Sequence, residues 1–236
     1  MENDYDSFAE AYAAENETSL LNAYYARPAI LNLAGNVAGR RILDAGCGAG
    51  TVTEGLRDRG AIVSGFDSST KMVELARKRL GPDTDLRVAD ITGPLPYPDG
   101  TFDDVVAALV LHYLEDWTAP LAELRRVVKP GGRLIVVVNH PMIYKLVNPK
   151  ADYFAIRKHS EEYTFNGHPA VLTYWHRPLH AMTDAFTAAG FRTAIISEPP
   201  PAPEAHELFA DELARFPSGA FLGFLFFVLD AVRTPV

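Results

Sequence analysis

Short apolar runs alternate with amphipathic stretches through the central part of the chain. Runs of consecutive apolar residues are typical of strands buried on both faces of a sheet, whereas apolar residues three or four positions apart indicate a helix packed on one side. The pattern predicts strands at residues 41–43, 61–66, 85–89, 104–110 and 134–138, and helices between them at 51–59, 70–80 and 118–128. Strands that alternate with helices in this way are typical of an α/β fold with a parallel sheet.

The pattern continues beyond residue 176. Pro178 lies in the first turn of a predicted helix that ends at Ala189, before Gly190. A sixth strand is predicted at residues 191–197, a short helix at 205–215 and a final strand at 221–229. We find no internal repeat.

Two regions depart from the alternation. Residues 1–39 have no strand pattern, and their apolar residues indicate two short amphipathic helices. Residues 141–176 form a long connection between strand and helix, rich in Tyr, Phe and Trp. Connections of this length often form lids over a site, and aromatic side chains exclude water there. The alternative is an accessory subdomain, with a hairpin that turns at Asn166-Gly167.

A glycine-rich turn follows the first strand. Asp44 ends the strand, and Gly46, Gly48 and Gly50 lead into the next helix. Glycine lets a ligand approach the backbone, and a helix start offers unpaired N–H groups. Dinucleotide-binding turns have the spacing G-x-G-x-x-G, which differs from the G-x-G-x-G found here. A carboxylate at Asp44 suits a cationic ligand better than a pyrophosphate, although a tight turn without ligand remains the simpler alternative.

The second strand also ends in an acid. Asp67 lies 17 residues after Gly50. Ribose hydroxyls are held by a carboxylate about 20 residues past such a glycine turn, at the end of the second strand. Asp67 could equally cap the helix that follows Ser68 and Ser69.

Residues 42–50 resemble motif I of the class I S-adenosylmethionine-dependent methyltransferases. Further segments share the resemblance: Asp90-Ile91 after the third strand, residues 95–103, and Pro130-Gly131-Gly132 before the fifth strand. The chain as a whole is similar to bacterial small-molecule methyltransferases of type 11 or 25. This resemblance implies a Rossmann-like, seven-stranded, mostly parallel sheet with helices on both faces and an antiparallel last strand. It also implies one methyltransferase domain over residues 1–236, with 1–39 as a helical lid and 141–176 over the substrate site.

The resemblance further assigns a cofactor site for S-adenosylmethionine, whose product is S-adenosylhomocysteine. It implies that Asp67 binds the ribose diol, that Asp90 accepts from the adenine amino group and that Ile91 packs on the ring. The other residues that it assigns are Tyr12 at the methionine end, Ser68 and Met72 on the adenine side, and Asp44, Gly46, Cys47, Gly48 and Leu109.

The composition and net charge disfavour some classes of binding partner. The 236 residues carry a formal net charge of −8, with 48% hydrophobic and 22% charged residues. Phosphate binding depends on Lys and Arg, so we expect no nucleic-acid substrate. The single cysteine, Cys47, excludes an intrachain disulfide. The acidic, polar start does not resemble a signal peptide, and residues 221–229 are too short to span a bilayer. We therefore expect a cytoplasmic protein, either a monomer or a homodimer.

Three histidines are candidates for a general base. His112 follows the fourth strand, His140 follows the fifth, and His176 ends the aromatic connection. Histidine titrates near neutral pH and can accept a proton from an amine or hydroxyl. A structural role for His112, bonded to nearby backbone, remains the alternative. No spacing of histidines and carboxylates indicates a metal site.

The sequence thus predicts methyl transfer to O or N of a small, aromatic or heterocyclic metabolite. Methylation of a tRNA base or a carboxyl group is an alternative, as is a protein that binds the cofactor without transfer. A nicotinamide-dependent oxidoreductase is disfavoured by the glycine spacing and by Asp44.

Overall fold

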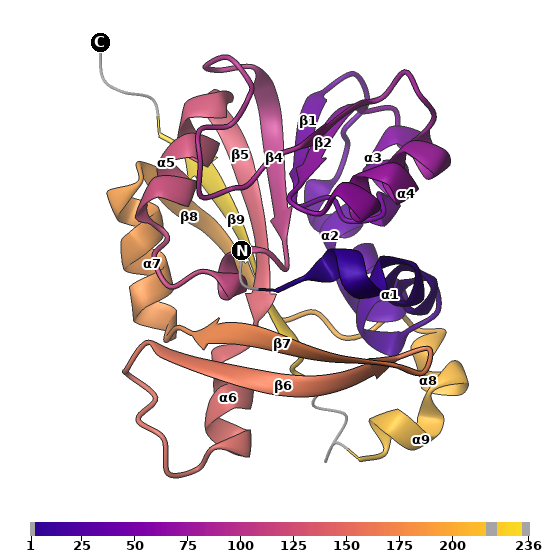
Figure 1. Ribbon diagram of the computed structural model, residues 1–236. Coiled ribbons are helices and arrows are strands. Elements are labelled where there is room, and N and C mark those ends of the chain that lie inside the picture. Colours follow the sequence, from indigo (N-terminus) through magenta and orange to yellow (C-terminus); the bar gives the residue numbers. More distant parts are fainter. Residues whose placement is uncertain (1–2, 216–220, 233–236) are drawn as a thin grey trace.

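A computed structural model describes residues 3–215 and 221–232. Its centre is a seven-stranded sheet (Figure 1). In spatial order the strands are β3 (Asp85–Val88), β2 (Ile62–Asp67), β1 (Arg41–Ala45), β4 (Phe102–Ala108), β5 (Val128–Asn139), β9 (Phe224–Ala231) and β8 (Phe191–Ser197). The first five pair in parallel, and β9 runs antiparallel to both β5 and β8. The predicted sheet, with its antiparallel last strand, is therefore confirmed.

Helices cover both faces of the sheet, because adjacent residues of its buried strands point in opposite directions. On one face Leu43, Val105 and Val136 pack with α5 (Thr118–Val127) and α7 (Leu179–Ala188). On the other face Ile42 and Val106 pack with α2 (Arg27–Ala34) and α3 (Thr51–Asp58). The near-continuous apolar runs of the sequence reflect this burial on both sides.

The helix α4 (Thr70–Leu80) follows β2 and has the predicted bounds. Ser69 caps it, since its Oγ accepts a hydrogen bond from the N–H of Met72 at 3.0 Å. A short turn of 3-10 helix, η3 (Leu111–Tyr113), follows β4. These boundaries place the ends of β1, β2 and β4 at one edge of the sheet.

The N-terminal region consists of η1 (Tyr5–Phe8) and α1 (Ala9–Asn16), then η2 (Asn22–Ala26), a π-helical turn that continues into α2. The strands β6 (Arg157–Phe165) and β7 (His168–His176) form a separate hairpin that turns at Asn166-Gly167, as predicted. Both turn residues have positive φ, 44° and 82°. Phe8 stacks on Phe165 with ring centroids 5.5 Å apart, which joins the N-terminal region to the hairpin.

Several predicted boundaries were wrong. The fourth strand is Phe102–Ala108 rather than 104–110, and the last is Phe224–Ala231 rather than 221–229. The fifth strand begins at Val128, because the Pro130-Gly131-Gly132 segment bulges within it and shifts the pairing with β4. The helix predicted at 205–215 divides into α8 (Ala205–Leu208) and α9 (Ala210–Leu213).

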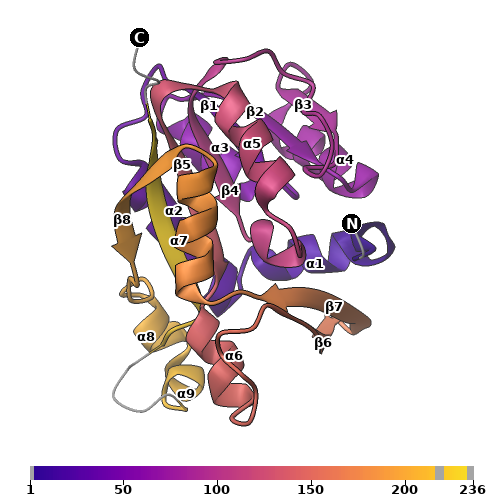
Figure 2. The ribbon, with the colours of Figure 1, turned by 90° about the vertical axis from the view of Figure 1, so that its left-hand side faces the viewer.

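The remaining helix, α6 (Pro141–Val147), leads from β5 toward the hairpin and lies at one end of the molecule (Figure 2). None of the helices in the described ranges combines the length and the apolar character needed to cross a bilayer.

Candidate functional site

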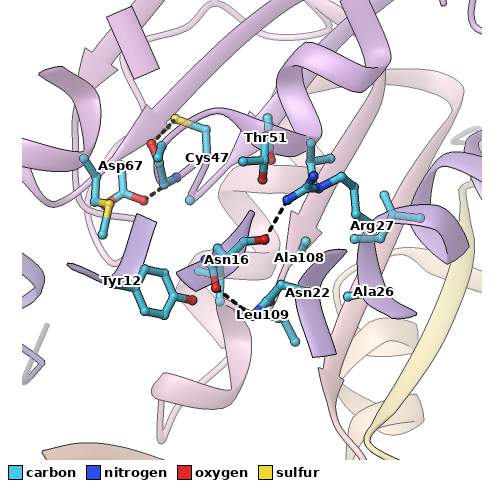
Figure 3. A pocket seen from close by; sticks show the side chains of 18 of the residues that line it. Tyr12, Asn16, Asn22, Ala26, Arg27, Cys47, Thr51, Asp67, Ala108 and Leu109 are labelled. Carbon is cyan, nitrogen blue, oxygen red and sulfur yellow. Dashed lines mark hydrogen bonds between the residues drawn. The ribbon is translucent and has the colours of Figure 1, made fainter. Parts of the chain in front are cut away.

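A pocket, here called the central pocket, opens at the carboxyl ends of β1, β2 and β4 (Figure 3). The glycine turn and the start of α4 form one wall, and the N-terminal helices form another. Open α/β sheets bind their ligands at this edge. Eight residues predicted for the cofactor line the pocket: Tyr12, Asp44, Gly46, Cys47, Gly48, Asp67, Met72 and Leu109.

The glycine turn needs its glycines for two reasons. Gly46, Gly48 and Gly50 have φ values of 75°, 52° and 83°, which side chains of L-residues rarely allow. A Cβ at Gly46 would lie 2.3 Å from Cγ2 of Val110. The N–H groups of Gly46 and Cys47 both donate to the carbonyl oxygen of Phe66, which holds the turn against the end of β2.

Asp67 lies at the end of β2 and holds two adjoining loops. Its Oδ2 accepts from the N–H of Gly48 and its Oδ1 from the N–H of Ser69, both at 2.9 Å. Burial raises the pKa of Asp67 in spite of these bonds. A carboxylate has about four acceptor positions, so Asp67 keeps acceptor capacity for a ligand in the pocket.

Asp44 is the second carboxylate of the pocket and is only 2% exposed. Thr53 Oγ1, on α3, donates to its Oδ2 at 2.6 Å. Burial is the main cause that raises the pKa of Asp44 to about 6, and the charge of Asp67 adds to it. The ionised form of Asp44 is therefore costly without a nearby positive charge, which a cationic ligand would supply.

Among the polar residues of the pocket that were not predicted from the sequence, three come from the N-terminal helices: Asn16, Asn22 and Arg27. Asn22 Nδ2 donates to Asn16 Oδ1 at 2.6 Å, and Arg27 Nη2 donates to the carbonyl oxygen of Asn16 at 2.8 Å. Arg27 Nε is buried and has no hydrogen-bond partner within the described chain. In Figure 3, Arg27 and Asp67 lie on opposite sides of the pocket. No local motif marks these residues, because α1, the π-helical turn and α2 bring them together only in the folded chain.

The remaining walls are apolar or aromatic. Met72 comes from α4, and Tyr5, Tyr12 and Tyr113 also line the pocket. The hydroxyls of Tyr5 and Tyr113 lie 2.5 Å apart. Leu109 has a φ of 58°, a left-handed conformation that costs energy for a branched residue. Such backbone outliers are concentrated at ligand sites.

Three predicted cofactor residues lie elsewhere. Ser68 and Asp90 line a second hollow, beside the N-terminal segment 3–6, and Tyr5 lines both cavities. Thr92 donates to Asp90 Oδ1 through its N–H and its hydroxyl, at 2.9 and 2.8 Å. Ile91 lines neither cavity, because it is 1% exposed and packs in the core with Phe66 and Tyr97.

The three histidines line neither cavity, and each one contacts a different neighbour. His112 Nδ1 accepts from the N–H of Asn139 at 3.1 Å, and burial lowers the pKa of His112 to about 3. His140 Nδ1 accepts from the N–H of Met142 and caps α6, while its Nε2 lies 2.7 Å from Glu198 Oε1. His176 Nε2 lies 2.8 Å from the carbonyl oxygen of Tyr153. Their roles in catalysis stay predictions.

Part of the chain is similar in sequence to known methyltransferases. Residues 43–136 match the family described as "Methyltransferase domain". A demethylmenaquinone methyltransferase of Tropheryma whipplei is 34% identical over 139 residues, which cover 58% of this chain and 58% of that protein. The chain thus matches little more than half the length of this curated relative.

Solved structures share the fold over most of the chain. One is a putative S-adenosylmethionine-dependent methyltransferase from Listeria monocytogenes, with a TM-score of 0.70 and 20% identity over 88% of this chain and 97% of that one. Another is the 1,6-didemethyltoxoflavin-N1-methyltransferase of Burkholderia thailandensis, with S-adenosylhomocysteine and 1,6-didemethyltoxoflavin bound. It has a TM-score of 0.61 and 15% identity over 96% of this chain and 88% of that one. Sheet order, glycine turn and sequence match agree: residues 43–136 match a methyltransferase domain, and the chain has the fold of the solved S-adenosylmethionine-dependent methyltransferases.

Proposed function

We propose that this protein transfers the methyl group of S-adenosylmethionine to an oxygen or nitrogen of a small aromatic or heterocyclic acceptor. The observation that carries the proposal is the central pocket, where the ends of neighbouring strands present Asp44 and Asp67 and where Arg27 lies opposite. S-adenosylmethionine supplies an electrophilic methyl group on a sulfonium centre. Its ammonium, carboxylate and ribose diol are the polar groups that the pocket must recognise.

The residues present fit this cofactor. Asp67 has acceptor positions left for the ribose diol, and buried Asp44 gains from a nearby ammonium or sulfonium charge. The buried, unpartnered Nε of Arg27 is a donor for a carboxylate, which guanidinium groups bind well. Met72 and Leu109 give the apolar surface that a nucleoside needs. Ser68 and Asp90 would then receive the adenine side in the second hollow, which adjoins the pocket at Tyr5.

The protein's own contribution to transfer is positioning and the exclusion of water. The N-terminal helices and the hairpin would act as a cover, because Phe8, Phe165 and Tyr174 pack into a small core of their own. An acceptor O–H or N–H must lose its proton, and His112, His140 and His176 stay the candidates for its removal. Burial raises the pKa values of Tyr5 and Tyr113, so neither phenol is suited to act as a tyrosinate base.

The acceptor class is inferred from two sources. The aromatic side chains of the connection between β5 and α7 include Tyr144, Tyr153 and Tyr174, and flat rings stack well on such groups. The relative named above is a demethylmenaquinone methyltransferase, and one structural neighbour holds 1,6-didemethyltoxoflavin. A tRNA base is the less favoured acceptor because the chain carries a formal net charge of −8.

The test of the function combines binding with transfer. Calorimetric titration should show binding of S-adenosylmethionine and S-adenosylhomocysteine and no binding of NAD. Incubation with methyl-labelled cofactor and a panel of quinols, phenols and nitrogen heterocycles should then give a labelled product. Binding without transfer across the panel would favour a non-catalytic cofactor-binding protein. No binding of either sulfur nucleotide would overturn the proposal.

Binding of S-adenosylmethionine should weaken as the pH falls from 7 to 5. The pKa of Asp44 is about 6, so the carboxylate is mostly ionised above pH 7 and mostly protonated at pH 5. Because the cofactor is cationic, it favours the ionised form, and one pH unit below the pKa corresponds to a loss of about tenfold in affinity. Calorimetry across this range measures the effect. An Asp44→Asn variant should bind weakly with little change between pH 5 and 7, and a variant that keeps the wild-type pH dependence would exclude Asp44 as its source.

A further inference from the structure

The helix α6 and the loop that follows it expose several large apolar side chains. Leu146 and Val147 are each 63% exposed and Phe154 is 71% exposed. Met142 and Ile156 are also exposed, at 41% and 40%. These five residues, here called the apolar surface, belong to a stretch of fifteen residues, whereas the other exposed large hydrophobic residues are scattered over the described chain. Clusters of this kind mark interaction sites rather than ordinary surface.

The same stretch is basic in an acidic protein. Residues 141–158 contain Lys145, Lys150, Arg157 and Lys158 and a single acid, Asp152, although the whole chain has a formal net charge of −8. Lys150, Arg157 and Lys158 are exposed. The surface that meets a partner here therefore combines apolar groups with positive charge, and its partner should combine apolar groups with negative charge.

The structure holds the helix and loop together. Lys145 Nζ donates to the carbonyl oxygens of Pro149 and Ala151, at 2.7 and 2.8 Å, so the loop turns back beside α6. His140 caps the start of α6, and its contact with Glu198 fixes the helix to the segment after β8. Figures 1 and 2 both show α6 and this loop at the end of the molecule, beyond the hairpin and away from the sheet.

We propose that the apolar surface and its basic residues dock on an anionic lipid bilayer. Amphipathic segments with basic residues lie in the interface of a membrane, with their apolar side chains among the acyl chains and their charges near anionic headgroups. Each basic side chain near such a surface contributes about fivefold in affinity. A neutral protein partner would gain nothing from the positive charge.

This docking goes beyond methyl transfer and does not rest on it. Where the proposed function holds, docking gives the protein access to apolar acceptors that dissolve in the bilayer. The chain would lie on the membrane without crossing it.

The experiment is co-sedimentation of the full chain with lipid vesicles. Vesicles of phosphatidylcholine with about 30% phosphatidylglycerol should sediment the protein, whereas vesicles of phosphatidylcholine alone should sediment at least about fivefold less. Raising the salt concentration should release it, because screening weakens the attraction. Failure to sediment with anionic vesicles at low salt would overturn the proposal.

Matched variants locate the surface. Leu146→Ser with Phe154→Ser should lower vesicle binding by about tenfold or more, since two exposed apolar side chains no longer insert. Ile62→Ser with Val171→Ser changes two side chains that are 58% and 60% exposed elsewhere and should leave vesicle binding unchanged. Equal binding by the two double variants would overturn the assignment.

Two further readouts separate the other outcomes. Titration with S-adenosylhomocysteine reports on the cofactor site in every variant, so a failure of the proposed function is seen independently of docking. Light scattering during gel filtration reports on self-association. A dimer that the Leu146→Ser, Phe154→Ser variant loses, without vesicle binding by the wild type, would show that a second copy occupies the surface.

Discussion

Replacement of Asp67 by alanine should weaken the binding of S-adenosylmethionine and S-adenosylhomocysteine by about a hundredfold or more. A hydrogen bond to a charged group contributes about 1.5–3 kcal/mol, and we propose that the carboxylate accepts two from the ribose diol. The change also removes the acceptors of the N–H groups of Gly48 and Ser69, which hold the glycine turn and the start of α4. The hydrogen bonds to the ligand and those to the backbone are lost at the same wall of the central pocket.

Calorimetric titration of the variant with both sulfur nucleotides measures this effect. Asp83→Ala is the matched control, because Asp83 is an exposed acid after α4 and lines neither cavity. Thermal unfolding of each variant shows whether the fold persists. If Asp67→Ala binds within about twofold of the wild type, the carboxylate does not contact the ribose and the assigned position of the cofactor is wrong.

The largest loss of stability is expected from Asp104→Ala. This carboxylate is fully buried in β4 and forms ion pairs with both Arg40 and Arg133. Arg40 Nη2 and Arg133 Nε both donate to Asp104 Oδ1 at 2.8 Å. Removal of one member of a buried ion pair leaves charge without compensation and lowers the free energy of unfolding by about 3–5 kcal/mol.

Urea unfolding of Asp104→Ala and of Asp58→Ala measures the difference. Asp58 forms a more exposed pair with Arg57 at 3.6 Å, and such pairs contribute about 0–1 kcal/mol. An equal decrease in the free energy of unfolding in the two variants would show that the ion pairs of Asp104 stabilise the fold no more than a surface pair does.

The contribution of Asp104 should also depend on pH. Burial tends to raise the pKa of Asp104, but the hydrogen bonds from Arg133 and Arg40 outweigh it and hold the pKa below its usual value. A carboxyl group whose pKa is lower in the folded state stabilises the fold above its unfolded pKa, about 3.9, and loses that contribution as the pH falls further. The difference in stability between wild type and Asp104→Ala should therefore be constant near neutral pH and shrink below about pH 4.

The local features of the site could be read from the sequence. Asp44 and Asp67 end apolar strands, and parallel strands bring their carboxyl ends to one edge, so the sequence order of the two acids already places them together. The glycines between them need positive φ in a tight turn, which is a property of the backbone over a few residues. Ser69 as a helix cap and Asn166-Gly167 as a hairpin turn belong to the same class of local signal.

Features that depend on packing between distant segments could not be predicted from the sequence. Arg27 and Asn16 belong to different N-terminal helices, and their places in the pocket depend on how those helices cross the edge of the sheet. Ser68 and Met72 were both predicted on the adenine side of the cofactor, but Met72 lines the central pocket and Ser68 lines the second hollow. The contacts of His140 and His176 could not be predicted either, whereas a bond between His112 and nearby backbone was one of the two alternatives that the sequence left open.

The sequence by itself therefore determined the α/β fold, the glycine turn and the two strand-end carboxylates, because apolar periodicity and turn chemistry act over a few neighbouring residues. Only the tertiary structure decided that Arg27 and Asn16 complete the pocket wall, that Ile91 packs in the core and that α6 is left exposed. These outcomes depend on contacts between segments that are far apart in the chain, and no short-range pattern records such contacts.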